Sequence, residues 1–285
     1  MRLHQPLTPL EALERFLAEP GVRESVAARE LLPAREASFA PFPGWLDPRL
    51  VRALEHRGIE ALYSHQHEAL EALHAGGDVV IVTPTASGKS LCYNLPVLQE
   101  ICEDPAARAL YLFPTKALSQ DQLAEFRSLS EQAEMGLSAA VYDGDTPAPI
   151  RAVVREAGQV VVTNPDMLST AVLPHHTKWF QLFEQLRYIV VDEAHTYRGI
   201  FGSHVANVLR RLLRVCAHYG SEPRIVCSSA TVGNPGELAE TLTGRPFRVI
   251  DQSGAPTGER HVVVLDPPPF DPRTGVRPGP HGMAY

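Results

Sequence analysis

Apolar positions in the middle of the chain fall into two patterns that alternate along the sequence. Short, nearly continuous runs of Val, Ile and Leu predict buried strands, and these lie at 78–83, 108–113, 137–142, 159–163, 187–192, 224–228 and 247–250. Apolar residues at helical spacing predict helices between them, among them 49–57, 64–75, 88–102 and about 116–130. Continuous apolar strands followed by helices are typical of a parallel sheet covered on both faces. The pattern therefore predicts an α/β fold.

The two ends of the chain differ from this middle part. A capping box with proline at the first helical position, Thr8-Pro9-Leu10-Glu11, predicts a short helix to about Ala18 within an N-terminal extension, 1–48. Near its end lie four apolar residues, Phe39, Phe42, Trp45 and Leu46. We expect them to pack on the core, and contact with a nucleotide base is the alternative. Six prolines and three glycines among residues 266–285 predict a linker or tail. The expected domain is 49–265.

Composition narrows the class of protein. With 44% hydrophobic and 21% charged residues, the 285-residue chain has the balance of a soluble globular protein. No apolar run reaches the roughly 18 residues that span a bilayer, and the N-terminus lacks a signal-peptide core, so we expect no membrane partner and a cytoplasmic location. The four scattered cysteines form no CxxC pair, which disfavours zinc and disulfides. At a net charge of −7, any nucleic-acid site must be local.

One predicted strand and the helix after it enclose a phosphate-binding loop. In VVIVTPTASGKS (Val79–Ser90), an apolar strand ends in small residues, and Gly88-Lys89-Ser90 open the helix. Backbone N–H groups and the helix dipole bind phosphate in such loops. Lys89 would reach the β- and γ-phosphates of ATP and Ser90 would bind Mg²⁺, beside the loop residues Thr85, Ala86, Ser87 and Gly88. Thr83 replaces the usual first glycine, and the alternative is an ordinary turn capped by Gly88.

A second strand, about a hundred residues later, ends in two carboxylates. In RYIVVDEAH, Asp192 can hold the Mg²⁺ shell and Glu193 can polarise the attacking water, which makes both candidate catalytic residues together with Lys89. Solvated acids at a strand end are the alternative. The pairing with a phosphate-binding loop favours nucleotide hydrolysis.

Further segments follow one another in a characteristic order. They are Gly58-Ile59 with Tyr63 and Gln66, PTASGKS, PTKAL (114–118), YDGD (142–145), TNPD (163–166), DEAH and SAT (229–231). Over about 50–265 this order resembles the first motor domain of superfamily 2 DExH-box helicases. Longer runs such as LFPTKALSQDQ and DEAHTYRGIFGSHVANVLRRLLR resemble the bacterial MrfA-like DNA helicases, a group related to RecQ-four-like enzymes.

The resemblance implies a single RecA-like domain that binds ATP and Mg²⁺. It implies that Gln66 reads the adenine edge and Tyr63 shapes the base pocket. It also implies nucleic-acid contacts, for which helix caps and turns are the alternative, at Pro114, Thr115, Lys116, Gly144, Asp145, Thr163, Asn164, Pro165 and Asp166. Ser229 and Thr231, with His195, would couple hydrolysis to nucleic acid. Single-stranded or partly duplex DNA is the implied partner, translocated 3′ to 5′ in DNA repair.

Several positions depart from the pattern or stand outside it. Ala86 replaces the usual glycine of PTGSGK loops, and Ser169 stands where the MrfA-like group more often has histidine. His175 and His176 are expected in a surface loop, with metal binding as the minor alternative. A solvated helix face, with phosphate contact as the alternative, is expected for Arg210, Arg211 and Arg214.

The sequence shows one set of motifs for the first lobe and no second βα series after it. We therefore expect one lobe, whose partner is a second RecA-like lobe in cis or in trans, and slow or absent hydrolysis by the chain alone. The alternatives are a nucleotide-dependent nucleic-acid-binding module without turnover, an RNA helicase fragment, or a P-loop ATPase acting on proteins.

Overall fold

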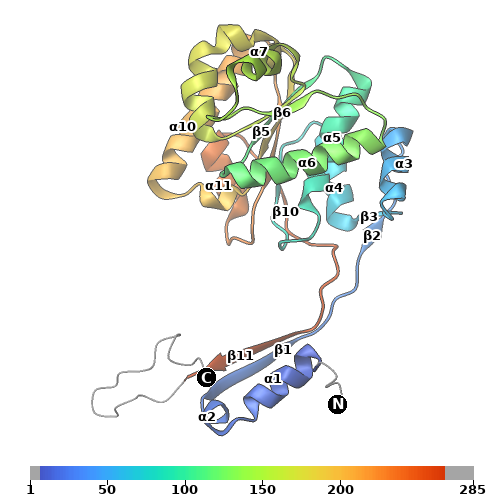
Figure 1. The fold of residues 1–285 in the computed structure, drawn as a ribbon, viewed down its shortest axis with the longest axis vertical. Helices are drawn as coiled ribbons and strands as arrows, with labels where there is room; N and C mark the ends of the chain where they lie inside the picture. Colours follow the sequence, from blue (N-terminus) through green and yellow to red (C-terminus); the bar gives the residue numbers. More distant parts are fainter. Residues whose placement is uncertain (1–6, 267–285) are drawn as a thin grey trace. The chain divides into compact units, whose positions relative to one another are not determined.

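The computed structural model describes residues 7–266, so nearly all of the predicted tail at 266–285 lies outside the described residues. Its centre is a seven-stranded parallel sheet (Figure 1). In spatial order the strands are β10 (Arg248–Ile250), β4 (Val79–Ile81), β9 (Arg224–Ser228), β8 (Leu186–Val191), β5 (Arg108–Leu112), β7 (Val160–Thr163) and β6 (Ala139–Val141). All seven predicted strands are present, and the predicted α/β class is confirmed.

Each face of this sheet has its own apolar core because successive strand residues point to opposite faces. One core contains Val79, Ile81 and Tyr111. It is covered by α3 (Pro48–His56), α4 (Ser64–His74), α5 (Lys89–Glu103) and α6 (Lys116–Gln132). The other contains Val80 and Leu112. It is covered by α7 (Ala148–Ala157), α8 (Pro165–Met167), η1 (Leu168–Val172), η2 (Leu173–Trp179), α9 (Phe180–Glu184), α10 (Gly199–His218) and α11 (Pro235–Thr243). Helices on both faces were predicted.

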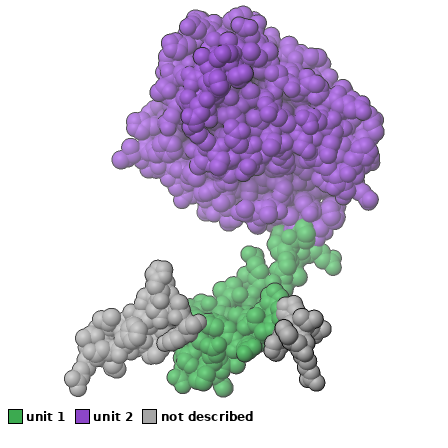
Figure 2. Space-filling view, viewed as in Figure 1, with its two compact units in different colours: residues 1–36, 256–285 green, residues 37–255 purple. Residues whose placement is uncertain are grey.

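A smaller compact unit combines the two ends of the described chain. Within residues 7–36 and 256–266 lie α1 (Pro9–Leu17), α2 (Pro20–Arg23), β1 (Val26–Leu32) and β11 (Arg260–Leu265) (Figure 2). β1 pairs antiparallel with β11. The predicted capping box is present, since the Thr8 hydroxyl accepts from the Glu11 N–H at 3.3 Å and the Glu11 carboxylate accepts from the Thr8 N–H at 2.8 Å.

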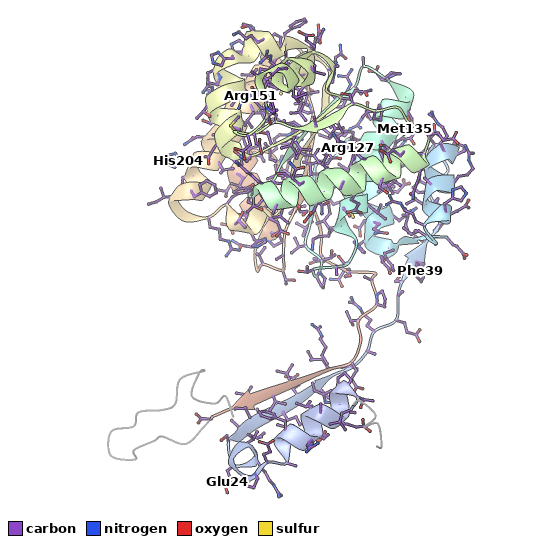
Figure 3. The ribbon with its side chains drawn as sticks, viewed as in Figure 1. Glu24, Phe39, Arg127, Met135, Arg151 and His204 are labelled. Atoms are coloured by element: carbon purple, nitrogen blue, oxygen red, sulfur yellow. The ribbon has the colours of Figure 1, made fainter. Side chains whose placement is uncertain are left out.

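The compact units divide the chain after residues 36 and 255, not at the expected 48 and 265. Residues 37–48 join the larger unit, where β2 (Phe39–Ala40) pairs with β3 (Leu62–Tyr63). Leu46 is buried there and Trp45 packs against the core, as expected. Phe39 is 62% exposed instead (Figure 3), so the expectation that it packs on the core is wrong.

Two further findings concern the composition. Cys92, Cys216 and Cys227 are buried free thiols, and Cys102 is half-buried. Among residues 7–266, no helix has both the length and the apolar character needed to cross a membrane.

Candidate nucleotide and nucleic-acid site

The phosphate-binding loop joins β4 to α5 and depends on one glycine. Gly88 precedes the first residue of α5 in the left-handed region, with φ of +77°, and its carbonyl accepts from Gln66 Nε2 at 2.9 Å. A Cβ at this position would lie 2.6 Å from the same nitrogen. Ala86 also has a positive φ, +62°. In the first turn of α5 the Leu91 N–H donates to the Gly88 carbonyl at 3.2 Å, and the N–H groups of Lys89 and Ser90 before it are the ones placed to bind an anion.

Thr83 at the first-glycine position is explained by a hydrogen bond inside the loop. Its hydroxyl lies 2.6 Å from that of Ser87, and both side chains are buried. The two hydroxyls therefore join the beginning and the end of the loop. A threonine in place of the usual first glycine therefore adds a hydrogen bond between side chains that closes the loop.

Lys89 and Ser90 both have partners within the protein. The Lys89 ammonium donates to the Thr83 carbonyl at 2.7 Å and to the Pro84 carbonyl at 3.1 Å. Burial lowers the pKa of Lys89, while the charges of Glu193 and Asp192 raise it. Ser90 Oγ donates to Glu125 Oε1 on α6 at 3.0 Å.

A cavity of about 680 Å³ opens beside the loop. Its lining includes Ala86, Gly88 and Ser90 of the loop, and Phe39, Arg57, Tyr63, Gln66 and Glu125 from elsewhere. The Gln66 amide uses both of its ends, because Oε1 accepts from the Tyr63 N–H at 2.9 Å while Nε2 donates to Gly88. The exposed Phe39 ring stacks on Tyr63 with centroids 5.3 Å apart. Phe39 thus lines the same cavity as Tyr63 and Gln66, which fits the alternative prediction for this residue.

The two DEAH carboxylates follow β8. Asp192 is 6% exposed, and its Oδ1 accepts a hydrogen bond from the Ser228 hydroxyl at the end of β9. Burial raises the pKa of Asp192, and the hydrogen bond from Ser228 opposes this shift. Glu193 has a left-handed backbone, with φ of +51°. Such a conformation is uncommon for a residue other than glycine, and it turns the chain at the end of the strand.

His195 connects this segment to the SAT segment through the backbone. The Ala230 N–H donates to His195 Nδ1 at 3.2 Å, and Glu193 Oε2 lies 3.1 Å from the same nitrogen. Nδ1 accepts from Ala230 when it carries no proton, whereas a protonated Nδ1 would donate to Glu193. Ser229 is buried and its hydroxyl donates to the Ala230 carbonyl, while Thr231 is exposed. Sequence reasoning placed this link on the two side chains and missed the Ala230 backbone.

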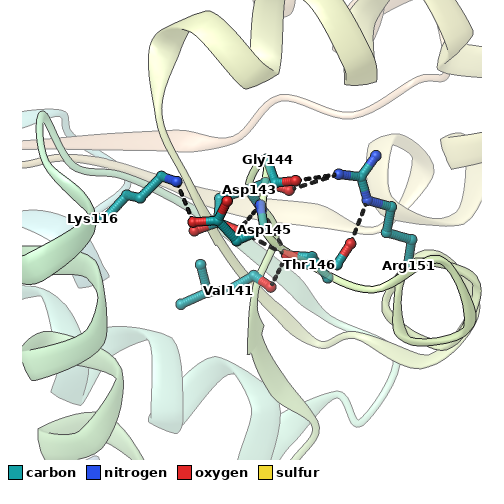
Figure 4. Close-up of polar contacts among 7 residues, drawn as sticks. All are labelled: Lys116, Val141, Asp143, Gly144, Asp145, Thr146 and Arg151. Carbon is teal, nitrogen blue, oxygen red and sulfur yellow. Dashed lines mark hydrogen bonds and ion pairs between the residues drawn. The ribbon is translucent and has the colours of Figure 1, made fainter.

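The loops after β5 and β6 are joined by an ion pair. Thr115 caps α6, and Lys116 in its first turn pairs with Asp145 (Figure 4). Both charged side chains are exposed. Arg151 of α7 donates to the Asp143 carbonyl at 3.0 Å and to the Gly144 carbonyl at 3.1 Å, which fixes the loop that carries Asp145. Pro114 is half-buried at the start of this turn.

The TNPD segment (163–166) at the end of β7 is partly buried. The Thr163 hydroxyl is buried and donates to the Tyr142 carbonyl at 2.7 Å, so this side chain braces the sheet edge. Asn164 caps α8 by accepting from the Met167 N–H at 2.9 Å, with Pro165 at the first helical position. Asp166 is exposed. Of these four residues, Asn164 and Asp166 have the more accessible side chains.

The topology brings the predicted site residues to one edge of the sheet. In a parallel sheet the carboxyl ends of the strands share an edge, where ligands bind. The phosphate-binding loop follows β4, DEAH follows β8, and the predicted nucleic-acid loops follow β5, β6 and β7. β9 separates β4 from β8 and supplies Ser228.

The remaining basic candidates have structural partners or lie on the surface. His176 Nδ1 lies 2.8 Å from the Tyr219 hydroxyl. Arg210 donates to the Thr241 carbonyl at 2.9 Å, whereas Arg211 and Arg214 are exposed. His175 and His176 lie in η2, so the expected surface loop is wrong, and His176 is half-buried against Tyr219. The exposed Arg211 and Arg214 agree with a solvated helix face.

Comparison with known proteins identifies the family. Residues 63–238 match the DEAD/DEAH box helicase model, and the chain belongs to this family. It is 51% identical over 267 residues to the uncharacterized ATP-dependent helicase YprA of Bacillus subtilis, covering 94% of this chain and 36% of YprA. It is 40% identical to the ATP-dependent helicase HRQ1 of Saccharomyces cerevisiae, covering 83% of this chain and 22% of HRQ1.

Solved structures agree with this assignment. The DUF1998 helicase MrfA bound to DNA matches with a TM-score of 0.89 and 50% identity over 94% of this chain and 38% of the MrfA chain. MrfA bound to DNA and AMPPNP matches with a TM-score of 0.89 and 49% identity, covering 96% of this chain and 37% of that one. The predicted resemblance to superfamily 2 helicases of the MrfA-like group is confirmed. The chain spans less than two fifths of the length of these relatives.

Proposed function

We propose that this chain is the ATP-binding lobe of an ATP-dependent DNA helicase or translocase. The observation that carries the proposal is the order of the strands, since the loop with Lys89 and the segment with Asp192 and Glu193 both begin at the carboxyl end of the same parallel sheet. These groups follow β4 and β8, which are separated only by β9. A cation for phosphate, a carboxylate for a metal and a carboxylate for water are the parts that ATP hydrolysis requires.

Ser90 and Asp192 would hold Mg²⁺. The donor set fits because a hydroxyl and a carboxylate are hard oxygen ligands of the kind Mg²⁺ prefers. Bound Mg²⁺ would offset negative charge on the β- and γ-phosphates. Ser228 would keep Asp192 oriented through its hydrogen bond to Oδ1.

The remaining residues have distinct roles in this proposal. Lys89 would exchange its bonds to the Thr83 and Pro84 carbonyls for bonds to phosphate oxygens. Glu193 would accept the proton of the attacking water. The base would occupy the cavity beside Tyr63, whose ring is extended by Phe39.

DNA is the proposed polymer, translocated 3′ to 5′ during repair. The support is MrfA, a relative at 50% identity whose structure holds DNA. The loops carrying Thr115, Lys116, Asp145, Asn164 and Asp166 would contact the backbone of one strand. A second RecA-like lobe, in the same polypeptide or supplied separately, is the other proposed partner, since an arginine from the opposite side of the nucleotide completes such sites.

Nucleotide binding tests the proposal most directly. Titration calorimetry with Mg²⁺-ATP should show binding by the 285-residue chain, and Lys89→Ala should remove most of it. Losing this charge-assisted bond should weaken affinity by about 1.5–3 kcal/mol. Lys178→Ala is the matched control, because Lys178 is exposed on η2. Equal dissociation constants for the Lys89 variant and the wild type would refute the phosphate-binding role.

Turnover separates a motor lobe from a binding module. The chain alone should hydrolyse ATP very slowly and without stimulation by single-stranded DNA, because a missing arginine finger costs roughly 10³–10⁵ in rate. Adding a second lobe, fused or in trans, should restore hydrolysis, and Glu193→Gln should then abolish it. Fast, DNA-stimulated hydrolysis by the monomeric chain would contradict the one-lobe argument.

A further inference from the structure

We infer that Glu125 of α6 is a positioning residue for Ser90. Its carboxylate accepts the hydrogen bond of the Ser90 hydroxyl, which leaves the lone pairs of the hydroxyl oxygen available to the metal ion that accompanies the nucleotide. The inference rests on the proposed function, which makes Ser90 a metal ligand. It adds a carboxylate from a helix that carries none of the sequence-predicted nucleotide-binding residues.

The geometry brings Glu125 to the edge of the phosphate-binding loop. Ser90 lies in the first turn of α5 and Glu125 in the middle of α6, and Ser90 Oγ donates to Glu125 Oε1 at 3.0 Å. Both residues line the cavity that also contains Gln66 and Gly88. Glu125 is therefore part of the wall that a nucleotide would meet.

Glu125 is not needed to hold the two helices together. One turn further along, the Tyr93 hydroxyl of α5 donates to Gln122 Oε1 of α6 at 2.9 Å. Leu91 and Leu95 of α5 also share a buried core with Leu123 of α6. The helix contact therefore has other supports, and the bond from Ser90 to Glu125 can act locally on the hydroxyl.

The chemistry of a serine hydroxyl gives the bond its direction. The group has one proton and two lone pairs. When the proton is donated to Glu125, the lone pairs remain available to a cation. A cation on the oxygen polarises the O–H bond and makes it a better donor, and hydrogen bonds to a carboxylate are already the stronger kind. Cation binding and the bond to Glu125 therefore support each other.

The opposite role would be competition, in which Ser90 must leave Glu125 before it binds the metal ion. The two roles predict opposite signs for the loss of Glu125. Positioning predicts that more Mg²⁺ is needed for nucleotide binding, whereas competition predicts that less is needed.

The test measures the affinity of a fluorescent, non-hydrolysable ATP analogue as a function of Mg²⁺ concentration, and again in EDTA. Glu125→Ala should raise the Mg²⁺ midpoint by about tenfold or more, the usual cost of losing an outer partner of a metal ligand. Its affinity in EDTA should match the wild type. Glu125→Gln, which keeps an acceptor oxygen, should raise the midpoint by less. Gln122→Ala is the matched control and should leave the midpoint unchanged.

A double-mutant cycle completes the test. In a Ser90→Ala background, Glu125→Ala should have no further effect on the Mg²⁺ midpoint, because its target hydroxyl is gone. Thermal unfolding shows which variants fold, and if Glu125→Ala does not, the smaller shift in Glu125→Gln decides. An unchanged or lowered midpoint in a wild-type-like fold would overturn the inference alone. A wild-type chain that binds no Mg²⁺-nucleotide would overturn the proposed function as well.

Discussion

Replacing Gly88 by alanine should damage the nucleotide site through a residue 22 positions away in the sequence, Gln66. Gly88 has φ of +77°, and a Cβ there would lie 2.6 Å from Gln66 Nε2. Gln66 cannot simply rotate away, because it is 2% exposed and its other amide atom accepts from the Tyr63 N–H. The substitution therefore combines backbone strain with the displacement of a buried amide.

The magnitude follows from these two parts. A left-handed backbone costs a residue with a Cβ about 1 kcal/mol. Displacing Gln66 breaks its bonds to the Gly88 carbonyl and the Tyr63 N–H, each with a net contribution of about 1 kcal/mol. We expect Gly88→Ala to lower the free energy of unfolding by about 3 kcal/mol.

Gly244 provides a matched control. It has φ of +78° at the end of α11, and a Cβ there would have no atom within 4 Å. Gly244→Ala should therefore show the backbone cost alone, about 1 kcal/mol. Urea unfolding followed by circular dichroism compares the two variants, and Mg²⁺-ATP titration should show weakened binding for Gly88→Ala only.

The outcome that refutes this reasoning is equal destabilisation of the two variants with nucleotide binding intact. The Gln66 side chain would then be free to move, and its two hydrogen bonds would contribute nothing to the loop. Destabilisation of Gly88→Ala with unchanged binding would separate the fold from the site, and would remove Gln66 from the nucleotide pocket.

Three other perturbations test different parts of the molecule. Asp145→Asn should strengthen single-stranded DNA binding by up to about fivefold, since it frees Lys116 from an exposed ion pair and keeps a polar side chain for the proposed backbone contact. Fluorescence anisotropy should show the gain shrinking at high salt, and weaker binding would show that the contact requires the Asp145 carboxylate. Asp78→Ala should lower the free energy of unfolding, measured by urea denaturation, by about 3 kcal/mol, because it removes the buried partner of Arg245. An unchanged free energy of unfolding would mean that the ion pair is solvated. Burial lowers the pKa of Lys89 below the ordinary lysine value of 10.5, so the ammonium loses its charge at a lower pH than an ordinary lysine does. Calorimetry should therefore show Mg²⁺-ATP affinity falling at alkaline pH below 10.5. Constant affinity up to that pH would contradict the lowered pKa.

Local patterns were sufficient to predict the sheet, its helices and the position of the phosphate-binding loop. The strand at 224–228 and the capped helix after Thr8 each follow from a few adjacent residues. Such features depend on side-chain periodicity and on caps, which act within one or two turns of the chain. The family resemblance could be predicted for the same reason, since its markers are short contiguous segments.

Features that depend on distant pairing could not be predicted. β1 pairs with β11 across more than two hundred residues, and β1 lacks the apolar alternation of a half-buried strand. β11 did carry a signal that could have been used, because it contains a run of three valines. Phe39 precedes apolar residues that are half-buried or buried, Phe42, Trp45 and Leu46, and the pairing of β2 with β3 explains its exposed position on Tyr63. Thr163 carried a signal that could have been used, because it closes a run of buried valines and its side chain follows them into the sheet.

The order of the strands gives the proposed site a third component, the end of β9, in addition to the phosphate-binding loop and the DEAH segment. β9 lies between β4 and β8, so its carboxyl end meets both halves of the proposed nucleotide site. Ser228 donates to Asp192, the Ser229 N–H donates to the Ile81 carbonyl, and the Ala230 N–H donates to His195. Three consecutive residues thus bond alternately to the DEAH segment and to the strand that leads into the phosphate-binding loop. A shift of either segment must strain these bonds, because the backbone of β9 is fixed within the sheet on both sides.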